Sequence, residues 1–267
     1  MMIDPQKLKS GLNPVVVSMD HHLESGSTND LIKSAAGDLS AGQWALVVTE
    51  QQNEGRGRRG TTWVSAAGES LTWSMATALR LPAEVWPRAS LVVGRALLEQ
   101  LGATDLRLKW PNDLLLMRDG EKPRKVAGVL CERHERPGDA ALWVVGIGLN
   151  LRRPQQPADV AALSAGLDET ELTPDPTALV AALSDAVISA VNAWTAREGR
   201  LDAASFDHNL AFRDSAVTLE FAPNQTEDVW LLGLTDTGQL RVQDLDAEGN
   251  PSAAPRAIEP WRLLGAH

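Results

Sequence analysis

The chain of 267 residues contains a single cysteine, Cys131, and no tyrosine. One cysteine excludes an internal disulfide, so we expect a protein of a reducing compartment, and the cytoplasm fits best. The sequence has no run of about 18 apolar residues, so we expect no transmembrane helix. It also lacks a basic start followed by an apolar stretch, so we expect no secretory signal.

Several common catalytic motifs are also missing. The sequence contains no H-E-x-x-H, no G-x-S-x-G and no paired C-x-x-C, which excludes zinc peptidases, α/β-hydrolases and zinc ribbons. The five histidines show no ligand spacing, and we expect them at the surface. Cys131 has no histidine partner in the local pattern, so we expect a small buried residue. The sequence therefore offers no credible nucleophile.

The chain is acidic, with 25 Lys and Arg against 35 Asp and Glu. This balance argues against general binding to nucleic acid or to an anionic membrane. Against that background, Gly55-Arg56-Gly57-Arg58-Arg59-Gly60 places three arginines on one short loop. Phosphate and carboxylate groups are what guanidinium groups bind best, so the loop indicates an anionic ligand.

The same loop matches G-x-G-x-x-G, which in dinucleotide-binding proteins follows a strand and opens a helix. The apolar segment 44–48 predicts the strand, but Thr61-Thr62-Trp63-Val64-Ser65 is β-prone and predicts no helix. Two alternatives remain open: a solvated arginine loop, and an anion-binding loop that becomes ordered on its ligand. We favour the second.

Hydrophobic patterning predicts an α+β fold. The links between several predicted strands are too short for helical crossovers, so the sheet should be mixed and mostly antiparallel. From residue 215 the pattern changes to short strands, and we predict a binding domain at 1–213 followed by a small all-β domain at 214–267. Strands are expected at 43–50, 70–79, 106–110, 114–117, 125–132, 142–150, 217–221, 229–234 and 239–246, and helices at 28–36, 87–101, 177–197 and 202–210.

Two further segments place polar side chains at the ends of apolar strands. Lys109-Trp110-Pro111-Asn112-Asp113 indicates either an ordinary β-turn or groups that face a cleft. Lys125 begins the strand Lys125-Val126-Ala127-Gly128, where it either extends to water or neutralises an anion. Gly146-Ile147-Gly148 would let a ligand approach the backbone closely.

Ser27-Thr28-Asn29 precedes these segments, and Gln52 and Trp63 lie on either side of the arginine loop. Taken in their order along the chain, these motifs, which end with Gly146-x-Gly148-x-Asn150, closely resemble those of the biotin protein ligase family over residues 25–152. The resemblance implies a catalytic domain like that of class II synthetases, followed by a C-terminal SH3-like β-barrel. About 25 residues precede Ser27, too few for a winged-helix domain, so we expect a monofunctional ligase that does not bind DNA. A lipoate or octanoate transferase and a module that binds RNA or a phosphorylated partner are the alternatives, and the net charge weighs against the second.

The resemblance also implies a two-step reaction. Biotin and MgATP give biotinyl-5′-AMP and pyrophosphate, and biotin then passes to one lysine of a carrier protein. The expected partner is the biotin carboxyl carrier domain of acetyl-CoA, propionyl-CoA or pyruvate carboxylase. Neither DNA nor a membrane is expected as a partner, while two copies could pair through a sheet edge or an apolar patch as a homodimer.

By the same resemblance, each motif has a role in that reaction. Lys125, Arg56 and Arg58 would be catalytic, and Asp113 would help to hold Mg²⁺ through water. Two departures from the family pattern stand out: Gly26 replaces a common acidic residue, and Glu54 adds negative charge beside the arginines, with which it could pair. The implied biotin-binding residues are Ser27, Thr28, Asn29, Gln52, Arg56, Gly57, Arg58, Lys125 and Gly128, and the implied ATP-binding residues are Trp63, Lys109, Asn112, Asp113 and Asn150.

Overall fold

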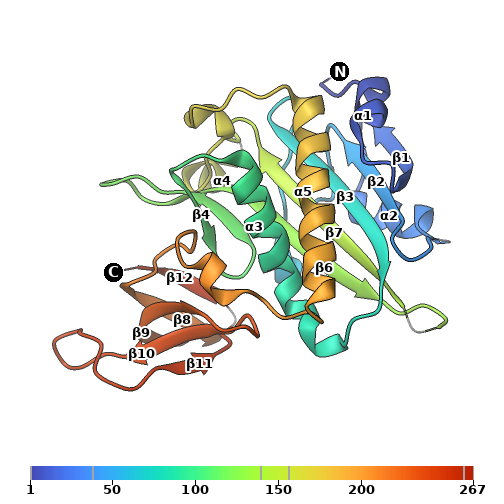
Figure 1. The fold of residues 1–267 in the computed structure, drawn as a ribbon. Coiled ribbons are helices and arrows are strands. Elements are labelled where there is room, and N and C mark those ends of the chain that lie inside the picture. The colour runs from blue at the N-terminus through green and yellow to red at the C-terminus, as the bar shows by residue number, and fades with distance from the viewer. Residues whose placement is uncertain (1, 38, 139, 156, 261, 267) are drawn as a thin grey trace.

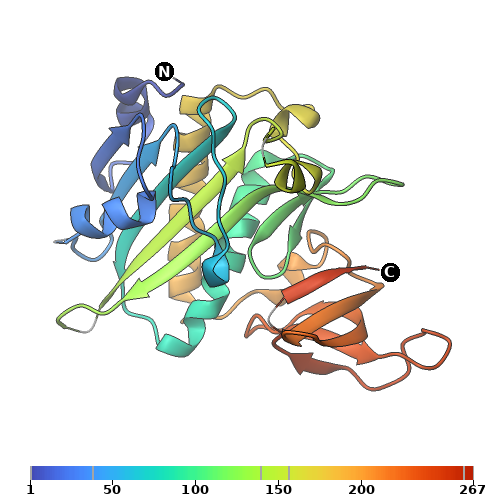
Figure 2. The ribbon, with the colours of Figure 1, turned by 180° about the vertical axis from the view of Figure 1, so that it is seen from behind.

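A computed structural model describes residues 2–37, 39–138, 140–155, 157–260 and 262–266 of the chain. The chain forms a large seven-stranded sheet, covered by helices, and a smaller five-stranded sheet at its C-terminal end (Figures 1 and 2). In the large sheet β1 and β2 run parallel and all the other paired strands are antiparallel. The predicted α+β class with a mixed, mostly antiparallel sheet is therefore confirmed.

The large sheet has the strand order β1-β2-β3-β7-β6-β5-β4. Its central strands β2, β3 and β7 are almost entirely buried on both faces. The sequences of β2 and β7 are nearly continuous apolar runs, whereas β3 alternates serine and threonine with apolar residues. The strands are β1 (Val16–His22), β2 (Trp44–Thr49), β3 (Ser70–Leu79), β4 (Leu106–Lys109), β5 (Asp113–Leu116), β6 (Arg124–His134) and β7 (Ala141–Asn150).

Alternate residues of β2 show how the two faces are covered. Trp44, Leu46 and Val48 belong to the large core on the side of α3 (Ala89–Leu101) and α5 (Pro176–Ala196), where α1 (Pro5–Gly11) also packs on α5. Ala45 and Val47 face the opposite way and pack with Ile32 of α2 (Thr28–Ala35) in a second, smaller cluster. The period of two in a strand thus sends one set of side chains to each helical layer.

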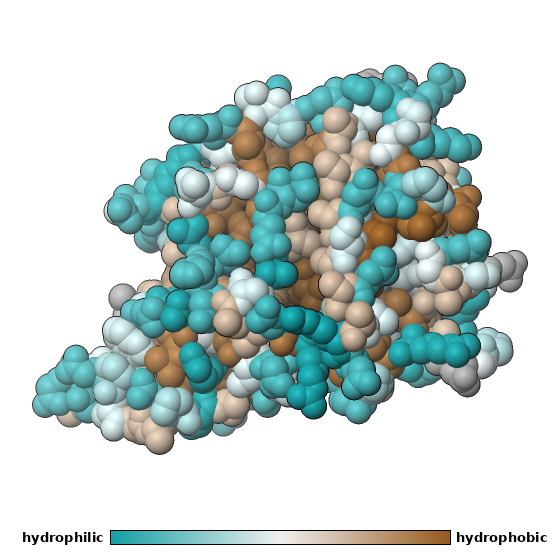
Figure 3. All heavy atoms as spheres, viewed as in Figure 1, coloured by the Kyte–Doolittle hydropathy of each residue, from teal (hydrophilic) through white to brown (hydrophobic). Residues whose placement is uncertain are grey.

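By length and composition alone, helix α5 could cross a membrane. The sequence predicted no such helix, because it has no unbroken run of about 18 apolar residues. Half of its most apolar stretch is buried inside the protein, where Leu183, Val187 and Val191 are fully enclosed. The side that carries α3 and α5 shows apolar residues along its middle (Figure 3). The leucine, valine and isoleucine residues that give α5 its high hydropathy are buried, so its packing is that of a core helix.

The C-terminal sheet has the order β11-β10-β9-β8-β12 and is antiparallel throughout. Trp110 ties it to the large sheet, because its Nε1 donates to the Gly238 carbonyl at 3.0 Å. The domain boundary at 213/214 stays a prediction, although β8 begins beside it. The strands are β8 (Ser215–Ala222), β9 (Gln225–Leu234), β10 (Leu240–Asp244), β11 (Arg256–Ile258) and β12 (Arg262–Ala266).

Several helices and strands of the structure differ from the prediction or were not predicted. The helix predicted at 202–210 is a single 3₁₀ turn, η4 (Ala203–Phe206). After it, Leu108 N–H donates to the Asn209 carbonyl and the Leu108 carbonyl accepts from Ala211 N–H, on either side of Leu210. Helix α3 starts after the 3₁₀ turn η2 (Ala83–Arg88), which contains Pro87. Strands β1, β11 and β12 and helix α1 were not predicted. Neither were α4 (Ala158–Ala162) and η3 (Leu167–Glu169), which lie between the strand predicted at 142–150 and the helix predicted at 177–197.

Glu50, which follows β2, anchors the N-terminal segment. Its Oε1 accepts hydrogen bonds from the backbone N–H groups of Met2 and Ile3, at 2.8 and 3.2 Å. His21 lies 3.3 Å from the same oxygen with its side chain 10% exposed, so the prediction that every histidine is at the surface is wrong here. Burial opposes the ionisation of Glu50, but the two backbone hydrogen bonds outweigh it and lower the pKa of this carboxyl.

Glu50→Gln is expected to lower the free energy of unfolding at pH 7 by about 1–2 kcal/mol, because charge-assisted bonds become neutral ones. A carboxyl whose folded pKa is lowered stabilises the protein above its unfolded pKa and loses that contribution as pH falls through the folded pKa. Urea unfolding at pH 7 and at pH 3 would measure both effects. A difference between wild type and variant that stays the same at the two pH values would contradict the assignment.

Candidate active site

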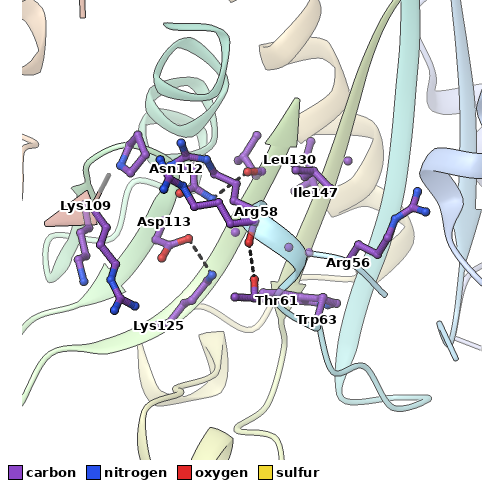
Figure 4. A pocket seen from close by; sticks show the side chains of 18 of the residues that line it. Arg56, Arg58, Thr61, Trp63, Lys109, Asn112, Asp113, Lys125, Leu130 and Ile147 are labelled. Atoms are coloured by element: carbon purple, nitrogen blue, oxygen red, sulfur yellow. Dashed lines mark hydrogen bonds and ion pairs between the residues drawn. The ribbon is translucent and has the colours of Figure 1, made fainter. Parts of the chain in front are cut away.

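A cavity of about 520 Å³ opens beside the ends of β5, β6 and β7, under the glycine–arginine loop (Figure 4). The C-terminal sheet contributes Glu220, Pro223, Arg262 and Leu263 to the cavity wall. All of the predicted site residues except Asn150 line the same cavity: Ser27, Thr28, Asn29, Gln52, Arg56, Gly57, Arg58, Trp63, Lys109, Asn112, Asp113, Lys125 and Gly128. Residues as far apart in the sequence as Ser27 and Leu263 therefore meet at one place.

The glycine–arginine loop folds back on itself. Gly57 N–H donates to the Thr61 carbonyl at 2.7 Å, and Trp63 N–H donates to the Gly55 carbonyl at 2.9 Å. A Cβ at Gly55 would lie 2.4 Å from the Trp63 carbonyl oxygen, so glycine here permits a close backbone approach. The tip is a 3₁₀ turn, η1 (Arg58–Gly60), and the residues after it are extended, so the dinucleotide-binding geometry is absent from this loop.

Arg58 extends over the cavity towards Asn112 (Figure 4). In the described parts of the chain, no carboxylate lies at ion-pair distance from its guanidinium, and Asp113 acts on it only from further away. Burial lowers the pKa of Arg58, and the neighbouring Arg59 lowers it further. A desolvated cation in this state is stabilised by an anion, so the geometry indicates a phosphate or carboxylate ligand.

Arg56 points to the other side of the loop (Figure 4). Its Nη2 lies 2.6 Å from Asp30 Oδ1 on α2, and this hydrogen bond lowers the pKa of Asp30. The expected pairing of an arginine with Glu54 is therefore replaced by the pair Arg56–Asp30. Because both side chains are about half exposed, this ion pair contributes little to the stability of the protein. Arg56 can therefore leave Asp30 and bind an anionic ligand instead.

Lys125 turns into the cavity rather than into bulk water. Its Nζ lies 2.7 Å from Asp113 Oδ1 and 5.4 Å from the ring centroid of Trp63. A Cβ at Gly128 would lie 2.9 Å from this Nζ, so the glycine leaves the space that the lysine fills. The Lys125 backbone is held by hydrogen bonds with Leu163 and Ala165. The side chain is thus a fixed positive charge on the cavity wall.

The segment 109–113 is a turn, as one alternative predicted, and it also faces the cavity, as the other predicted. Lys109 pairs with Asp113 across the β4–β5 hairpin. Burial lowers the pKa of Lys109, and the charge of Asp113 opposes that shift. Asn112 Nδ2 donates to the Val129 carbonyl at 2.9 Å, which fixes the turn against β6. Two half-buried cations, Lys109 and Arg58, therefore lie near one carboxylate.

A second part of the wall is polar and mostly uncharged. Ser27, Thr28 and Asn29 form the start of α2 and are almost fully buried, at 7%, 3% and 3% exposure. Gln52 Oε1 accepts the Thr28 backbone N–H at 2.8 Å. The cavity therefore combines a cationic region with a hydrogen-bonding recess, which suits a ligand with an anionic end and a neutral polar end.

Asn150 is outside the cavity wall. It is 2% exposed, and its Nδ2 donates to the backbone carbonyl of Ala165 at 3.1 Å, so it joins the end of β7 to the following loop.

The sequence did not predict Arg262 and Glu220 in the cavity wall, because their position depends on how the two sheets pack, for which the sequence carries no local signal. Burial raises the pKa of the Cys131 thiol to about 12, so a thiolate nucleophile is absent at neutral pH.

The sequence matches the biotin/lipoate A/B protein ligase family over residues 26–150. The bifunctional ligase/repressor BirA of Salmonella typhimurium is 37% identical over 153 residues, which cover 56% of this chain and 45% of that protein. The biotin–[acetyl-CoA-carboxylase] ligase of Paracoccus denitrificans is 38% identical over 131 residues, covering 47% and 51%. The chain spans about half the length of these relatives.

Solved structures agree with the fold over nearly the whole chain. The biotin protein ligase of Aquifex aeolicus, solved with biotin and ATP, has a TM-score of 0.67 at 22% identity, with 92% of this chain and 97% of that chain covered. This likeness extends past residue 150 to both sheets. The motifs that line the cavity fall within the matched region, so residues 26–150 of this chain are similar to the domain of the biotin/lipoate A/B protein ligase family.

Proposed function

We propose that this protein is an ATP-dependent biotin–protein ligase that makes biotinyl-5′-AMP and transfers biotin to a lysine of a carrier protein. The observation that carries the proposal is the position of Arg58 over the Lys125–Asp113 pair. This arginine is half-buried and has no carboxylate partner among the residues that the structure describes. The named relatives and the neighbour solved with biotin and ATP support the choice of substrates.

Biotin has one carboxylate and a neutral ureido ring with two N–H groups. The cationic region would take the carboxylate, and the recess at Ser27, Thr28 and Gln52 would take the ring. This orientation places the carboxylate where the nucleotide must also bring its α-phosphate. Two anions repel each other, so the cations around them lower the energy of their approach.

In the first step a carboxylate oxygen of biotin attacks the α-phosphorus of ATP, and the bond to the β-phosphate oxygen breaks. The products are biotinyl-AMP and pyrophosphate. Lys125 stabilises the charge that develops on the α-phosphate, and Arg58 neutralises the groups being joined. Lys109, Asn112 and Asp113 border the nucleotide side, and Trp63 offers a ring for the adenine.

In the second step the neutral amine of the acceptor lysine attacks the acyl carbon, and AMP leaves with the bonding electrons. The adenylate is a mixed anhydride and reacts with water, so the loop at 55–63, which covers the cavity, has to exclude solvent. The proposed acceptor is the biotin carboxyl carrier domain of a carboxylase. No covalent enzyme intermediate is required, in keeping with the inert Cys131.

Mg²⁺ would accompany the ATP. In the described residues no three His, Cys, Asp or Glu side chains gather as a metal site, but Asp113 supplies one carboxylate in the cavity wall. One carboxylate together with substrate phosphates and water is the donor set that Mg²⁺ commonly takes. When bound, Mg²⁺ would neutralise phosphate charge, so the residues present fit this ion as part of the nucleotide complex.

The test is isotope exchange between pyrophosphate and ATP with the purified protein. We expect exchange that depends on biotin and is not supported by lipoate or octanoate. Incubation with biotin, ATP and an isolated carrier domain should then add one biotin to that domain, measured by intact mass. Exchange with lipoate instead of biotin would move the assignment to the lipoate branch of the family, and no exchange with either would refute it.

A further inference from the structure

The cavity wall carries far more positive than negative charge. Six cationic side chains line it: Arg56, Arg58, Arg59, Lys109, Lys125 and Arg262. Of the residues that the structure describes, two carboxylates line the same wall, those of Asp113 and Glu220. The cations suit the anionic substrates of the first step, but the acceptor of the second step is a lysine, which is an ammonium ion at neutral pH. This ammonium has to enter a cavity that repels it, so it needs a carboxylate to receive it.

Asp113 already balances several of these cations. Its Oδ1 lies 2.7 Å from Lys125 Nζ (Figure 4). Burial lowers the pKa values of Arg58 and Lys109, and the charge of Asp113 opposes both shifts. A further cation at Asp113 would have to displace a wall residue that the first step uses. Glu220 is therefore the carboxylate of the wall that remains for the cation of the second step.

Glu220 reaches the cavity from the C-terminal sheet, where it lies near the end of β8. The register between β8 and β9 shifts between Glu220 and Ala222, and the register between β12 and β8 shifts after Leu263. Such irregularities change the direction in which side chains point, and they are frequent beside active sites. Both shifts lie next to the cross-strand pair of Glu220 and Arg262, and both members of that pair line the cavity.

The partner of Glu220 is easy to replace. The carboxylate forms an ion pair with Arg262, and the side chain of Glu220 is 13% exposed whereas that of Arg262 is 64% exposed. An exposed arginine loses little when it leaves an ion pair for water. A sheltered carboxylate loses more when it stays unpaired, so it favours another cation in the same place. An incoming ammonium ion can therefore take the position of the guanidinium.

We propose that Glu220 receives the acceptor lysine, and that its carboxylate binds the incoming ammonium in place of Arg262 at the wall of the cavity that the C-terminal sheet provides. This inference rests on the proposed function, in which the cavity holds biotinyl-AMP and the acceptor is a lysine of a carrier domain. Because the acceptor is the cationic substrate of the reaction, Glu220 acts in the second step. The small C-terminal sheet thereby supplies a substrate contact as well as part of the wall.

The test measures the second step alone, with the adenylate formed on the enzyme beforehand and two nucleophiles compared. One is an isolated carrier domain, whose lysine arrives as a cation, and the other is hydroxylamine, which is mostly uncharged at neutral pH. In Glu220→Gln the ratio of kcat/KM for the carrier domain to that for hydroxylamine should fall about 10–30-fold, the loss expected for one hydrogen bond between charged groups. General damage to the cavity would slow both nucleophiles alike, and the unchanged ratio would overturn the inference.

Two further variants separate this role from that of the ion pair. Arg262→Gln breaks the same pair but keeps the carboxylate, so it should lower the KM for the carrier domain; a loss like that of Glu220→Gln would show that the pair itself matters and would refute the assignment. Glu227→Gln removes a carboxylate that pairs with Arg256 on the same sheet, outside the cavity wall, and should keep the wild-type ratio. A wild-type protein that forms no adenylate from biotin and ATP would refute the proposed function instead.

Discussion

Lys125→Ala is expected to reduce biotin-dependent ATP–pyrophosphate exchange by about 10²–10³-fold, the loss typical of removing one preorganised group that stabilises charge in the transition state. The reason is geometric. Lys125 is held at the cavity wall by its backbone bonds to Leu163 and Ala165, and its Nζ faces Asp113. The binding of biotin alone should weaken far less than the rate of exchange falls, because the charge matters most as the new bond to phosphorus forms.

A second set of variants separates two roles for this lysine. Removing Lys125 leaves the half-buried carboxylate of Asp113 beside an incoming triphosphate, and repulsion alone would slow the reaction. Lys125→Met combined with Asp113→Asn removes both charges. Exchange should stay low in the double variant if Lys125 acts on the phosphate, and should recover if Lys125 serves mainly to neutralise Asp113.

Lys122→Ala, at an exposed position before β6, is the matched control and should keep wild-type exchange. Melting temperatures of all variants are needed beside the rates. A loss in Lys125→Ala that follows entirely from unfolding at the assay temperature would contradict the catalytic role.

The sequence predicted most of the cavity wall because the chemistry lies in short motifs at the ends of predicted strands. Lys109 to Asp113 and Lys125 could be placed at strand ends by patterning, and strand ends in one sheet meet along one edge. Asn150 also ends a strand but lies outside the cavity wall, so its predicted role at the nucleotide stays a prediction. Its side chain donates to the backbone carbonyls of Lys125 on β6 and of Ala165 in the loop after β7, and both partners lie outside its own motif.

Long-range pairing explains the elements that the sequence did not reveal. Strand β1 carries Ser18, Asp20 and His22 among its apolar residues, and it forms because β2 offers a buried parallel partner. The predicted helix at 202–210 contains Phe206 and Leu210, whose spacing fits a helix, but both side chains are buried in an irregular connection. In both places the backbone conformation is determined by tertiary contacts rather than by local propensity.

The two departures from the family pattern prove to be neighbours in space. Glu54 N–H donates to the Gly26 carbonyl at 2.9 Å, and a Cβ at Gly26 would lie 3.4 Å from Glu54 Oε2. The carboxylate of Glu54 therefore occupies the space beside position 26, where the family commonly has an acidic side chain. Sequence alone showed two independent changes, whereas the structure shows one carboxylate supplied from the other side of the same contact.

Arg58→Ala is expected to release biotinyl-AMP about 30–100-fold faster, which corresponds to the loss of one charge-assisted contact of about 2–3 kcal/mol. Arg58 differs from Arg56 in the present structure, because Arg56 already has Asp30 as a partner while Arg58 lies unpaired over the cavity in the described residues. An anion bound there replaces the water that burial has removed from the guanidinium. The adenylate should therefore leave the variant before the acceptor lysine arrives.

Two measurements follow the released adenylate. Rapid gel filtration after incubation with biotin and radiolabelled ATP measures how much adenylate stays bound, and biotin blotting of an added bystander protein measures labelling away from the carrier domain. Arg58→Lys should give an intermediate result, since the charge remains but the two-pronged contact is lost. Arg80→Ala, at an exposed arginine after β3, should behave as wild type. If Arg58→Ala retains as much adenylate as Arg80→Ala, the loop arginine does not hold the adenylate. The positive charge that holds it would then have to come from Lys109 or Arg262, which line the same cavity.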